Sequence, residues 1–170
     1  MDLKQYIRDI PDFPEPGILF RDITPLLRDH RAFKYVIDRL IERYQGDPLD
    51  TVVAVESRGF LFGAPLAYKM GKSFVPVRKK GKLPAATHAA AYALEYGSSI
   101  MEIHAGDIAQ GERVLVLDDL LATGGTLEAT ARLVEVSGGV VAGIGLVIEL
   151  TGLGGRRRLK DYEVFSLVQY

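Results

Sequence analysis

The chain has 170 residues, of which 48% are hydrophobic and 25% are charged, as is usual for globular proteins. Its formal net charge of -1 gives no long-range attraction for nucleic acid, so anion binding must come from local basic clusters. Cysteine is absent, and so is any uninterrupted apolar stretch of about 18 residues, which excludes disulfides, thiolate chemistry and a membrane helix and predicts a cytoplasmic protein.

Helices and strands are predicted to alternate after about residue 30. The predicted helices comprise about residues 33–44, 60–70 and 126–136. The predicted strands comprise residues 51–56, 74–77, 92–103, 114–117, 140–150 and 164–168. Such alternation indicates an α/β fold, a mostly parallel sheet flanked by helices, whose ligands bind beyond the carboxyl ends of the strands.

Two acids and a glycine-rich turn follow the aliphatic residues 114–117. The aliphatic run is typical of a strand covered on both faces, so Asp118 and Asp119 are expected at its carboxyl end. Gly124 and Gly125 permit close backbone approach, so successive N–H groups can face an anion at the start of the next helix. The pattern suits a ribose phosphate, because carboxylates can bind its hydroxyls.

The simpler interpretation of this segment is a strand, turn and helix in which the acids only cap the helix. The segment does not match two other phosphate motifs: Gly-Lys-Ser/Thr does not follow, and the glycines are not spaced as in dinucleotide sites. Nucleotide hydrolysis is therefore disfavoured.

Residues 114–126 resemble the phosphoribosyl pyrophosphate motif of the type I phosphoribosyltransferases, with wording similar to that of members acting on adenine. Other segments agree in order and spacing: residues 11–27, 56–63, 78–84 and 94–97. The resemblance covers the chain from about residue 6 to its end. It implies the type I phosphoribosyltransferase fold and transfer of the phosphoribosyl group from 5-phospho-α-D-ribose 1-diphosphate to adenine, giving AMP and diphosphate.

The resemblance also implies how the chain is divided. Residues 1–170 are expected to form a single phosphoribosyltransferase domain. About residues 1–30 would form an N-terminal hood over the base, and about residues 79–96 would form a mobile catalytic loop. Four of the five residues 78–82 are Lys or Arg, so closure of this loop would bring cations to the leaving diphosphate, although such a run is often only a solvated basic turn.

The resemblance assigns roles to individual residues. Those expected to bind the phosphate and ribose are Asp118, Asp119, Ala122, Thr123, Gly124, Gly125 and Thr126. Those expected to bind diphosphate are Ser57, Arg58, Lys79 and Lys82, in part through a loop with a cis non-proline peptide bond. Those expected at adenine are Leu19, Phe20 and Arg21: Phe20 would stack on the purine and the backbone of Arg21 would read its edge. Glu95, Asp118 and Asp119 are expected to be catalytic.

Partners and cofactors follow from the same resemblance. Mg²⁺ would arrive with the diphosphate and keep its waters, so no metal site made by the protein alone is expected. The histidines His30, His88 and His104 lack metal-ligand spacing. A homodimer is implied, and the apolar residues 60–62 are a candidate partner surface. No nucleic acid or membrane partner is expected.

Two other functions stay open. A related enzyme could use xanthine, hypoxanthine or orotate, although residues 20–23 favour adenine. A regulatory protein could sense the phosphoribosyl donor without using it, but it would need a nucleic-acid module. The basic cluster at residues 156–160 is too short for one and is more typical of a solvated surface.

Overall fold

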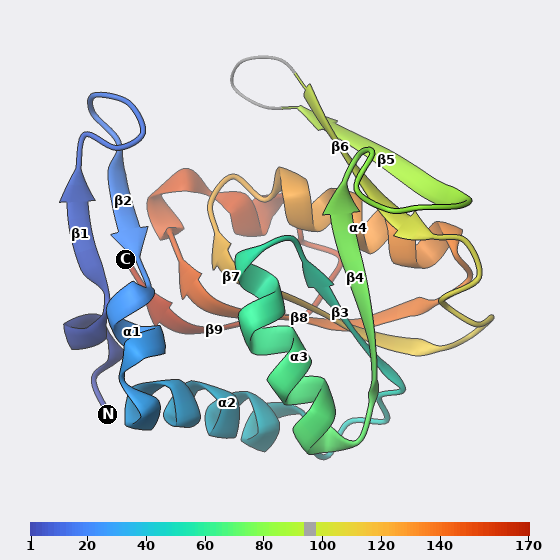
Figure 1. Ribbon diagram of the computed structural model, residues 1–170, viewed down its shortest axis with the longest axis horizontal. Coiled ribbons are helices and arrows are strands. Elements are labelled where there is room, and N and C mark those ends of the chain that lie inside the picture. Colours follow the sequence, from blue (N-terminus) through green and yellow to red (C-terminus); the bar gives the residue numbers. More distant parts are fainter. Residues whose placement is uncertain (94–97) are drawn as a thin grey trace.

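The computed structural model describes residues 1–93 and 98–170 (Figure 1). Within these residues, seven strands form one sheet in the order β5-β6-β4-β3-β7-β8-β9. They are β3 (Thr51–Val55), β4 (Ser73–Lys79), β5 (Thr87–Ala93), β6 (Ser98–His104), β7 (Arg113–Leu121), β8 (Val140–Glu149) and β9 (Val164–Gln169). Strands β4, β3, β7, β8 and β9 run parallel, while β5 and β6 extend the sheet as an antiparallel pair. The predicted mostly parallel sheet is confirmed.

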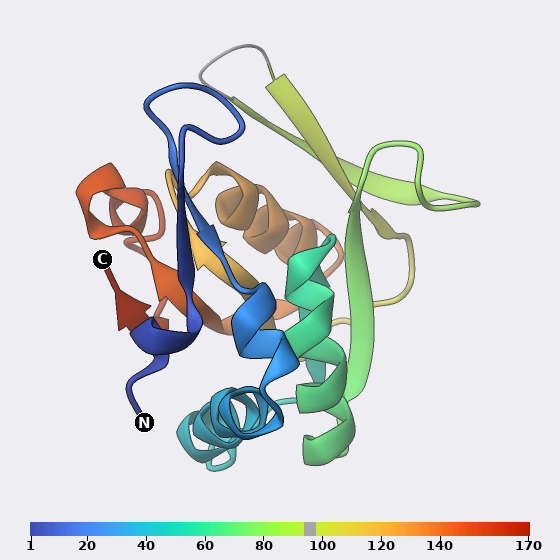
Figure 2. The same cartoon turned by 60° about the vertical axis from the view of Figure 1, so that its left-hand side comes forward.

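Helices cover both faces of the sheet, because alternate residues of each buried strand point to opposite sides. The helices are α1 (Thr24–Arg28), α2 (His30–Tyr44), α3 (Arg58–Met70) and α4 (Gly125–Val136). Val52 and Ala54 of β3 belong to the core beneath α2 and α3, whereas Val53 and Val55 belong to the core beneath α4. Figures 1 and 2 show α3 and α4 on opposite sides of the sheet. Within the described part of the chain, no helix is long and apolar enough to cross a membrane.

The N-terminal segment lies outside the large sheet. It consists of a 3-10 turn, η1 (Leu3–Tyr6), and a hairpin of β1 (Arg8–Pro11) and β2 (Leu19–Asp22) that forms its own antiparallel sheet. Figure 2 shows this hairpin standing beside the C-terminal end of the chain. Tyr170 contacts it directly, since the Arg21 guanidinium carbon lies 3.7 Å from the centre of the Tyr170 ring.

The structure differs from the sequence-based expectation at two places that border the site. Residues 87–93 form β5, where the sequence suggests a loop as far as Tyr92, because pairing with β6 gives these small residues a partner strand. Strand β7 continues to Leu121, so Asp118 and Asp119 lie inside the strand and not just beyond it. Movement of residues 79–96 stays a prediction.

Candidate functional site

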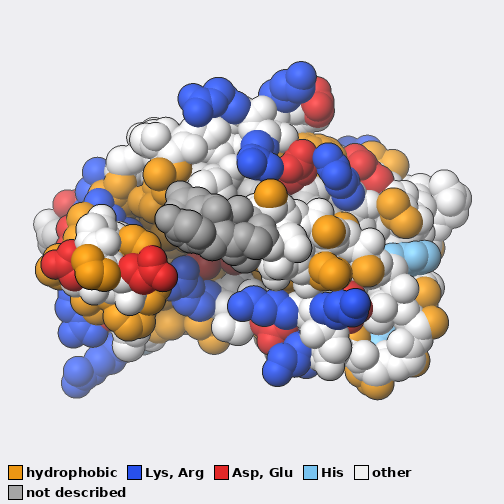
Figure 3. Space-filling model, turned by 90° about the horizontal axis from the view of Figure 1, so that it is seen from above, with side chains coloured by type: hydrophobic (Ala, Val, Ile, Leu, Met, Phe, Trp, Pro, Cys, Tyr) orange, Lys and Arg blue, Asp and Glu red, His pale blue; other side chains and the backbone are white. Residues whose placement is uncertain are grey.

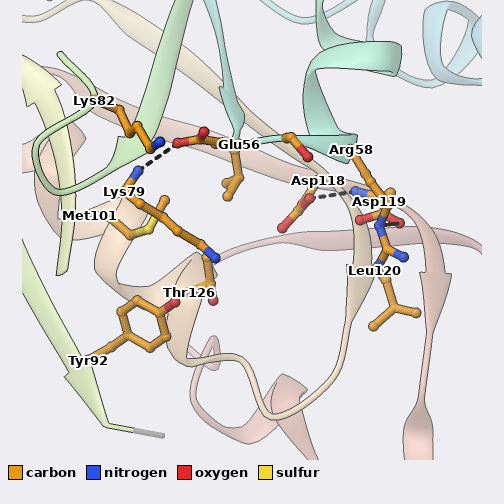
Figure 4. A pocket seen from close by; sticks show the side chains of 12 residues that line it. Glu56, Arg58, Lys79, Lys82, Tyr92, Met101, Asp118, Asp119, Leu120 and Thr126 are labelled. Carbon is orange, nitrogen blue, oxygen red and sulfur yellow. Dashed lines mark hydrogen bonds and ion pairs between the residues drawn. The ribbon is translucent and has the colours of Figure 1, made fainter. Parts of the chain in front are cut away.

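Loops that follow the parallel strands β3 and β4 and the end of β7 border a cleft of about 550 Å³. The cleft is lined by Val55, Glu56, Ser57, Arg58, Lys79, Lys82, Tyr92, Met101, Asp118, Asp119, Leu120 and Thr126. Figure 4 shows the acids of β7 and, across the cleft from them, Lys79 at the end of β4 and Lys82 in the turn that follows. Figure 3 looks onto this edge of the molecule, where basic and acidic side chains stand close together. The structure thus brings the predicted diphosphate and ribose residues into one cleft.

The two aspartates occupy different environments although they are adjacent. Asp119 is only 4% exposed, and its Oδ2 lies 2.8 Å from Arg58 Nε. Asp118 is half-buried, and its Oδ1 accepts a hydrogen bond of 2.8 Å from the Asp119 amide. Among the described residues, no Lys or Arg forms an ion pair with Asp118. Asp119 is therefore held by a cation, while Asp118 is left to face the cleft.

Burial and mutual repulsion control the ionisation of this pair. Burial raises the pKa of Asp118 well above its ordinary value, and the neighbouring Asp119 carboxylate raises it further. Burial also raises the pKa of Asp119, but the Arg58 guanidinium opposes that change. A ligand that brings positive charge or hydroxyl donors to Asp118 would relieve the cost of its buried negative charge.

The predicted phosphate loop, residues 122–126, joins β7 to α4. Gly124 has a φ of +87°, a conformation that favours glycine, and α4 begins at the next residue. The Gly124 carbonyl accepts the Glu128 amide at 2.9 Å as the first turn closes. The preceding amides of this helix end have no intrahelical partner and can bind an anion. A small cavity of about 80 Å³ lies here, lined by residues 120–127 and Asp118.

The loop between β3 and α3 is anchored to the end of β4. The Glu56–Ser57 peptide is cis, as the resemblance implies. Glu56 Oε2 accepts the Lys79 amide at 2.9 Å, and Oε1 accepts Arg78 Nη2 at 3.0 Å. Burial opposes ionisation of Glu56, but these hydrogen bonds outweigh it and lower its pKa. The sequence did not predict that Glu56 anchors this loop to the end of β4. The sequence showed only an acid after a buried strand and, further along, a run of basic residues.

The start of α3 packs directly onto the acid-bearing strand. A methyl group on Gly59 would lie 3.0 Å from the Leu117 carbonyl oxygen and 3.1 Å from Asp118 Oδ1. A side chain at residue 59 would make contacts tighter than usual, so glycine suits this close approach of α3 to the strand that carries Asp118. Gly59 is a second residue whose importance the local sequence pattern did not reveal.

The lysines at the end of β4 and in the turn that follows it divide into two groups. Lys79 and Lys82 line the cleft, and Figure 4 shows both side chains directed into it. The Lys82 amide donates to the Lys79 carbonyl at 3.2 Å, and the Gly81 amide donates to Glu102 Oε2 at 3.0 Å. Lys80 is exposed and does not line the cleft.

A second, more apolar cavity of about 480 Å³ adjoins the cleft beneath the hairpin. It is lined by Ile10, Phe13, Phe20, Asp22, Ile23, Thr24, Leu27, Arg58 and Leu61. Arg58 lines both cavities, and its guanidinium carbon lies 5.2 Å from the centre of the Phe20 ring. A flat apolar group in this cavity would therefore lie next to the acid pair.

The predicted adenine residues do not all face this cavity. Phe20 does, but Leu19 and Arg21 lie on the opposite face of β2 and line a different cavity with Tyr170. Strand alternation causes the separation, since neighbouring side chains point to opposite faces. The expectation for Arg21 concerned its backbone, which the side-chain direction does not affect.

Glu95, the predicted proton-transfer residue, lies outside the described residues.

The predicted partner surface on α3 stays a prediction, and only Leu61 of residues 60–62 is exposed to form it. Phe62 is fully buried, and the Phe60 ring packs edge-on against Phe74 with ring centres 6.0 Å apart. Leu61 is 43% exposed. Two of the three residues therefore serve the core.

Among the described residues, no group of three or more His, Cys, Asp or Glu side chains could hold a metal ion.

The phosphoribosyl transferase domain family matches residues 26–169. That range contains the acid pair, the phosphate loop and the turn bearing Lys79 and Lys82. The chain therefore belongs to the phosphoribosyltransferase family.

The full-length relatives are more specific. Adenine phosphoribosyltransferase of Acaryochloris marina is 59% identical over 170 residues, covering 100% of both chains. The enzyme of that name from Chloroflexus aurantiacus is 58% identical over 169 residues, covering 99% of this chain and 98% of the other. The crystal structure of adenine phosphoribosyltransferase from Thermoanaerobacter pseudethanolicus has a TM-score of 0.97 at 53% identity and covers 99% of this chain and 98% of its own. Both the resemblance and the type I fold predicted from sequence are confirmed.

Proposed function

We propose that this chain is an adenine phosphoribosyltransferase of purine salvage, which transfers the 5-phosphoribosyl group of 5-phospho-α-D-ribose 1-diphosphate to adenine and releases diphosphate. The observation that carries the proposal is the meeting of three features at one sheet edge. These are the acid pair of β7, the open amides at the start of α4, and the two lysines after β4. The apolar cavity behind Arg58 supplies the place for the base.

The donor would lie across the cleft with its two ends held differently. The 5'-phosphate fits the phosphate loop, where backbone amides and the hydroxyls of Thr123 and Thr126 can donate to it. The diphosphate fits the opposite side, near Ser57, Lys79 and Lys82. The ribose would then span the acid pair, whose carboxylates accept hydrogen bonds from its hydroxyls.

Catalysis would depend on the charges that surround the anomeric carbon. The bond to diphosphate breaks as an adenine nitrogen attacks, and positive charge develops on the ribose ring. Asp118 lines the cleft and would stabilise that charge, and Lys79 and Lys82, which line it too, would stabilise the departing anion. Asp119, paired with Arg58, would fix the geometry of the site.

The base site would work through shape and stacking. Phe20 presents its ring to the apolar cavity, and Arg58 covers one side of it. In support, the relative from Saccharomyces cerevisiae, 42% identical with a TM-score of 0.92, was crystallised with adenine and an imino-altritol bisphosphate. The Giardia lamblia relative, 34% identical, was crystallised with 9-deazaadenine. For Glu95 we propose proton transfer or stabilisation of the reacting base.

Mg²⁺ is the cofactor that this chemistry calls for, because it neutralises diphosphate and prefers oxygen ligands. The Asp118 carboxylate, which has no ion-pair partner in the part of the chain that the structure describes, offers oxygen ligands of the right kind. It would bind the metal only together with substrate oxygens and water, since the described residues offer no cluster of three ligands.

Three further properties belong to the proposal. We propose a homodimer, a cytoplasmic location consistent with the absence of cysteine, and a single domain in which the N-terminal hairpin serves as the hood.

The test is to offer the donor and Mg²⁺ with adenine, hypoxanthine, xanthine or orotate in parallel, using radiolabelled bases. AMP as the dominant product supports the proposal. A different nucleotide as the dominant product would replace it with a related transferase. Donor binding without transfer to any base would favour the regulatory function.

A further inference from the structure

Behind the phosphate loop, on the side away from the cleft, lies the turn that follows β8. This turn contains η2 (Thr151–Leu153) and η3 (Gly155–Arg157). It begins against β7, because the Leu150 amide donates to the Leu121 carbonyl at 2.9 Å. The connection between β8 and β9 is thus in contact with the end of the strand that carries the acid pair.

Gly155 is the point of closest contact. A methyl group on it would lie 2.3 Å from the Ala122 carbonyl oxygen and 3.1 Å from the Gly124 nitrogen. In the opposite direction, a methyl group on Gly124 would lie 2.7 Å from the Gly155 carbonyl oxygen. The two backbones therefore touch, so the position of residue 155 limits the shape that the phosphate loop can adopt.

An ion pair between the buried carboxylate of Glu149 and the partly exposed side chain of Arg156 holds Gly155 in place. Glu149, at the end of β8, is 4% exposed and accepts Arg156 Nε at 2.9 Å and Nη2 at 2.5 Å. Ser166 Oγ donates to the same carboxylate at 2.7 Å, and Arg156 Nη1 donates to the Val164 carbonyl at 2.8 Å. The fork geometry fixes both distance and orientation of residue 156, the immediate neighbour of Gly155.

We infer that Glu149, Gly155 and Arg156 are positioning residues that shape the phosphate loop for the 5'-phosphate of the ribose. None of the three lines the cleft or the small cavity of the loop. They act through contact with Ala122 and Gly124, and the inference rests on the proposed role of residues 122–126 as the 5'-phosphate site. Hydrogen bonding to Arg156 keeps the pKa of Glu149 below its usual range, so the pair is charged at neutral pH.

The experiment compares two ligands that occupy opposite ends of the cleft. Ribose 5-phosphate reports on the phosphate loop, and Mg²⁺-diphosphate reports on the lysine side. Calorimetric titration would be made with the wild-type chain and the variants Gly155→Ala and Glu149→Gln. Gly152→Ala is the matched control, because a methyl group on Gly152 meets nothing within 4 Å in the same connection.

We expect Gly155→Ala and Glu149→Gln to weaken ribose 5-phosphate binding at least tenfold, while Mg²⁺-diphosphate binding changes less than twofold and Gly152→Ala matches the wild type. Equal weakening of both ligands would mean a general structural role and would overturn the inference. So would unchanged ribose 5-phosphate binding in both variants. If Gly155→Ala does not fold, Glu149→Gln and Arg156→Lys decide the question. Failure of the wild-type chain to bind ribose 5-phosphate would instead reject the proposed phosphate site.

Discussion

Arg58 Nε lies 2.8 Å from Asp119 Oδ2, and this ion pair joins the two cavities of the site. The side chain of Asp119 is 5% exposed and that of Arg58 is 34% exposed. Among the described residues, the Arg58 guanidinium is therefore the only cation that pairs with the buried Asp119 carboxylate. Arg58 in turn is held beside Phe20, so the base cavity and the acid pair share one side chain.

Removal of Arg58 should destabilise the chain near neutral pH. Arg58→Ala leaves the buried Asp119 carboxylate without a cation, which costs about 2 kcal/mol. Urea unfolding at pH 7.5 measures the loss, and at pH 4 the loss should shrink because protonation removes the unpaired charge. Arg132→Ala is the control, since Arg132 forms an exposed pair with Glu128 on α4. A loss that is the same at both pH values would contradict this explanation.

Neutralising Asp118 should stabilise the unliganded chain and impair catalysis. Burial raises the native pKa of Asp118 above its ordinary value of 3.8, so the native state holds this proton to higher pH than the unfolded state does. Wild-type stability from this group is complete below about pH 3.8 and is lost as pH rises through the native pKa. Asp118→Asn avoids that loss, so its melting temperature should exceed that of the wild type at pH 7.5 and match it near pH 3.

The catalytic half of that prediction concerns turnover with adenine. Asp118→Asn removes the carboxylate from beside the developing positive charge, so kcat/KM for the donor should fall by about 100-fold or more. Steady-state kinetics at saturating adenine measures it. A variant that is both more stable and fully active would refute the assigned role.

Substitution of Gly59 should disturb the acid pair from the side of α3. In Gly59→Ala the new methyl group meets the Leu117 carbonyl oxygen at 3.0 Å and Asp118 Oδ1 at 3.1 Å, so these groups and the start of α3 must shift apart by a few tenths of an ångström. We expect kcat/KM for the donor to fall about tenfold or more, with KM for adenine changed less. Gly46→Ala is the matched control, because a methyl group there meets nothing within 4 Å. Similar kinetics in the two variants would show that this close approach has no functional consequence.

The lysines of the turn after β4 should differ in importance. Lys82→Ala removes a cation from the cleft and should raise the Kd for Mg²⁺-diphosphate by about fivefold to tenfold. Lys80→Ala removes the same charge from the adjacent exposed surface and should leave that Kd within twofold of the wild type. Calorimetry at two salt concentrations helps to separate a direct contact from a general field, since salt weakens a long-range field more than it weakens a close contact. Equal effects of the two substitutions would favour the solvated basic turn.

Glu95→Gln should depress turnover far more than adenine affinity. If Glu95 transfers a proton or stabilises the reacting base, it stabilises the transition state more than it stabilises bound adenine. The substitution should therefore lower kcat and change the Kd for adenine little. Pre-steady-state kinetics separates the chemical step from product release. Unchanged kcat would remove the assignment.

The sequence predicts the sheet and the placement of the acids because both depend on local patterns. A run of aliphatic residues followed by two acids and two glycines is enough to predict β7, the phosphate loop and α4. The same reasoning fails for β5, since its alanines become a strand only through pairing with β6. It also fails for the contact of Gly155 with Ala122, which joins residues far apart in the chain. Local patterns carry no signal for such long-range packing.

Within the site, charged side chains were easier to assign than their supports. Lys79 and Lys82 stand out as a cluster, whereas Glu56 and Gly59 gain their roles only from the neighbours that folding provides. The direction in which the side chains of Leu19 and Arg21 point likewise depends on the folded structure. It depends on which face of β2 turns inward, and a four-residue strand has too short a pattern to decide that.

The hairpin of β1 and β2 makes its ladder of backbone hydrogen bonds internally and contributes no strand to the large sheet. Under the proposed function, the hairpin would supply Phe13 and Phe20 to the base cavity, while the donor would be held at the strand ends of the large sheet. Arg58 and Leu61 of α3 line the same cavity, so a lineage that acquires a new heterocycle would have to alter codons of the hairpin while it keeps the arginine that pairs with Asp119.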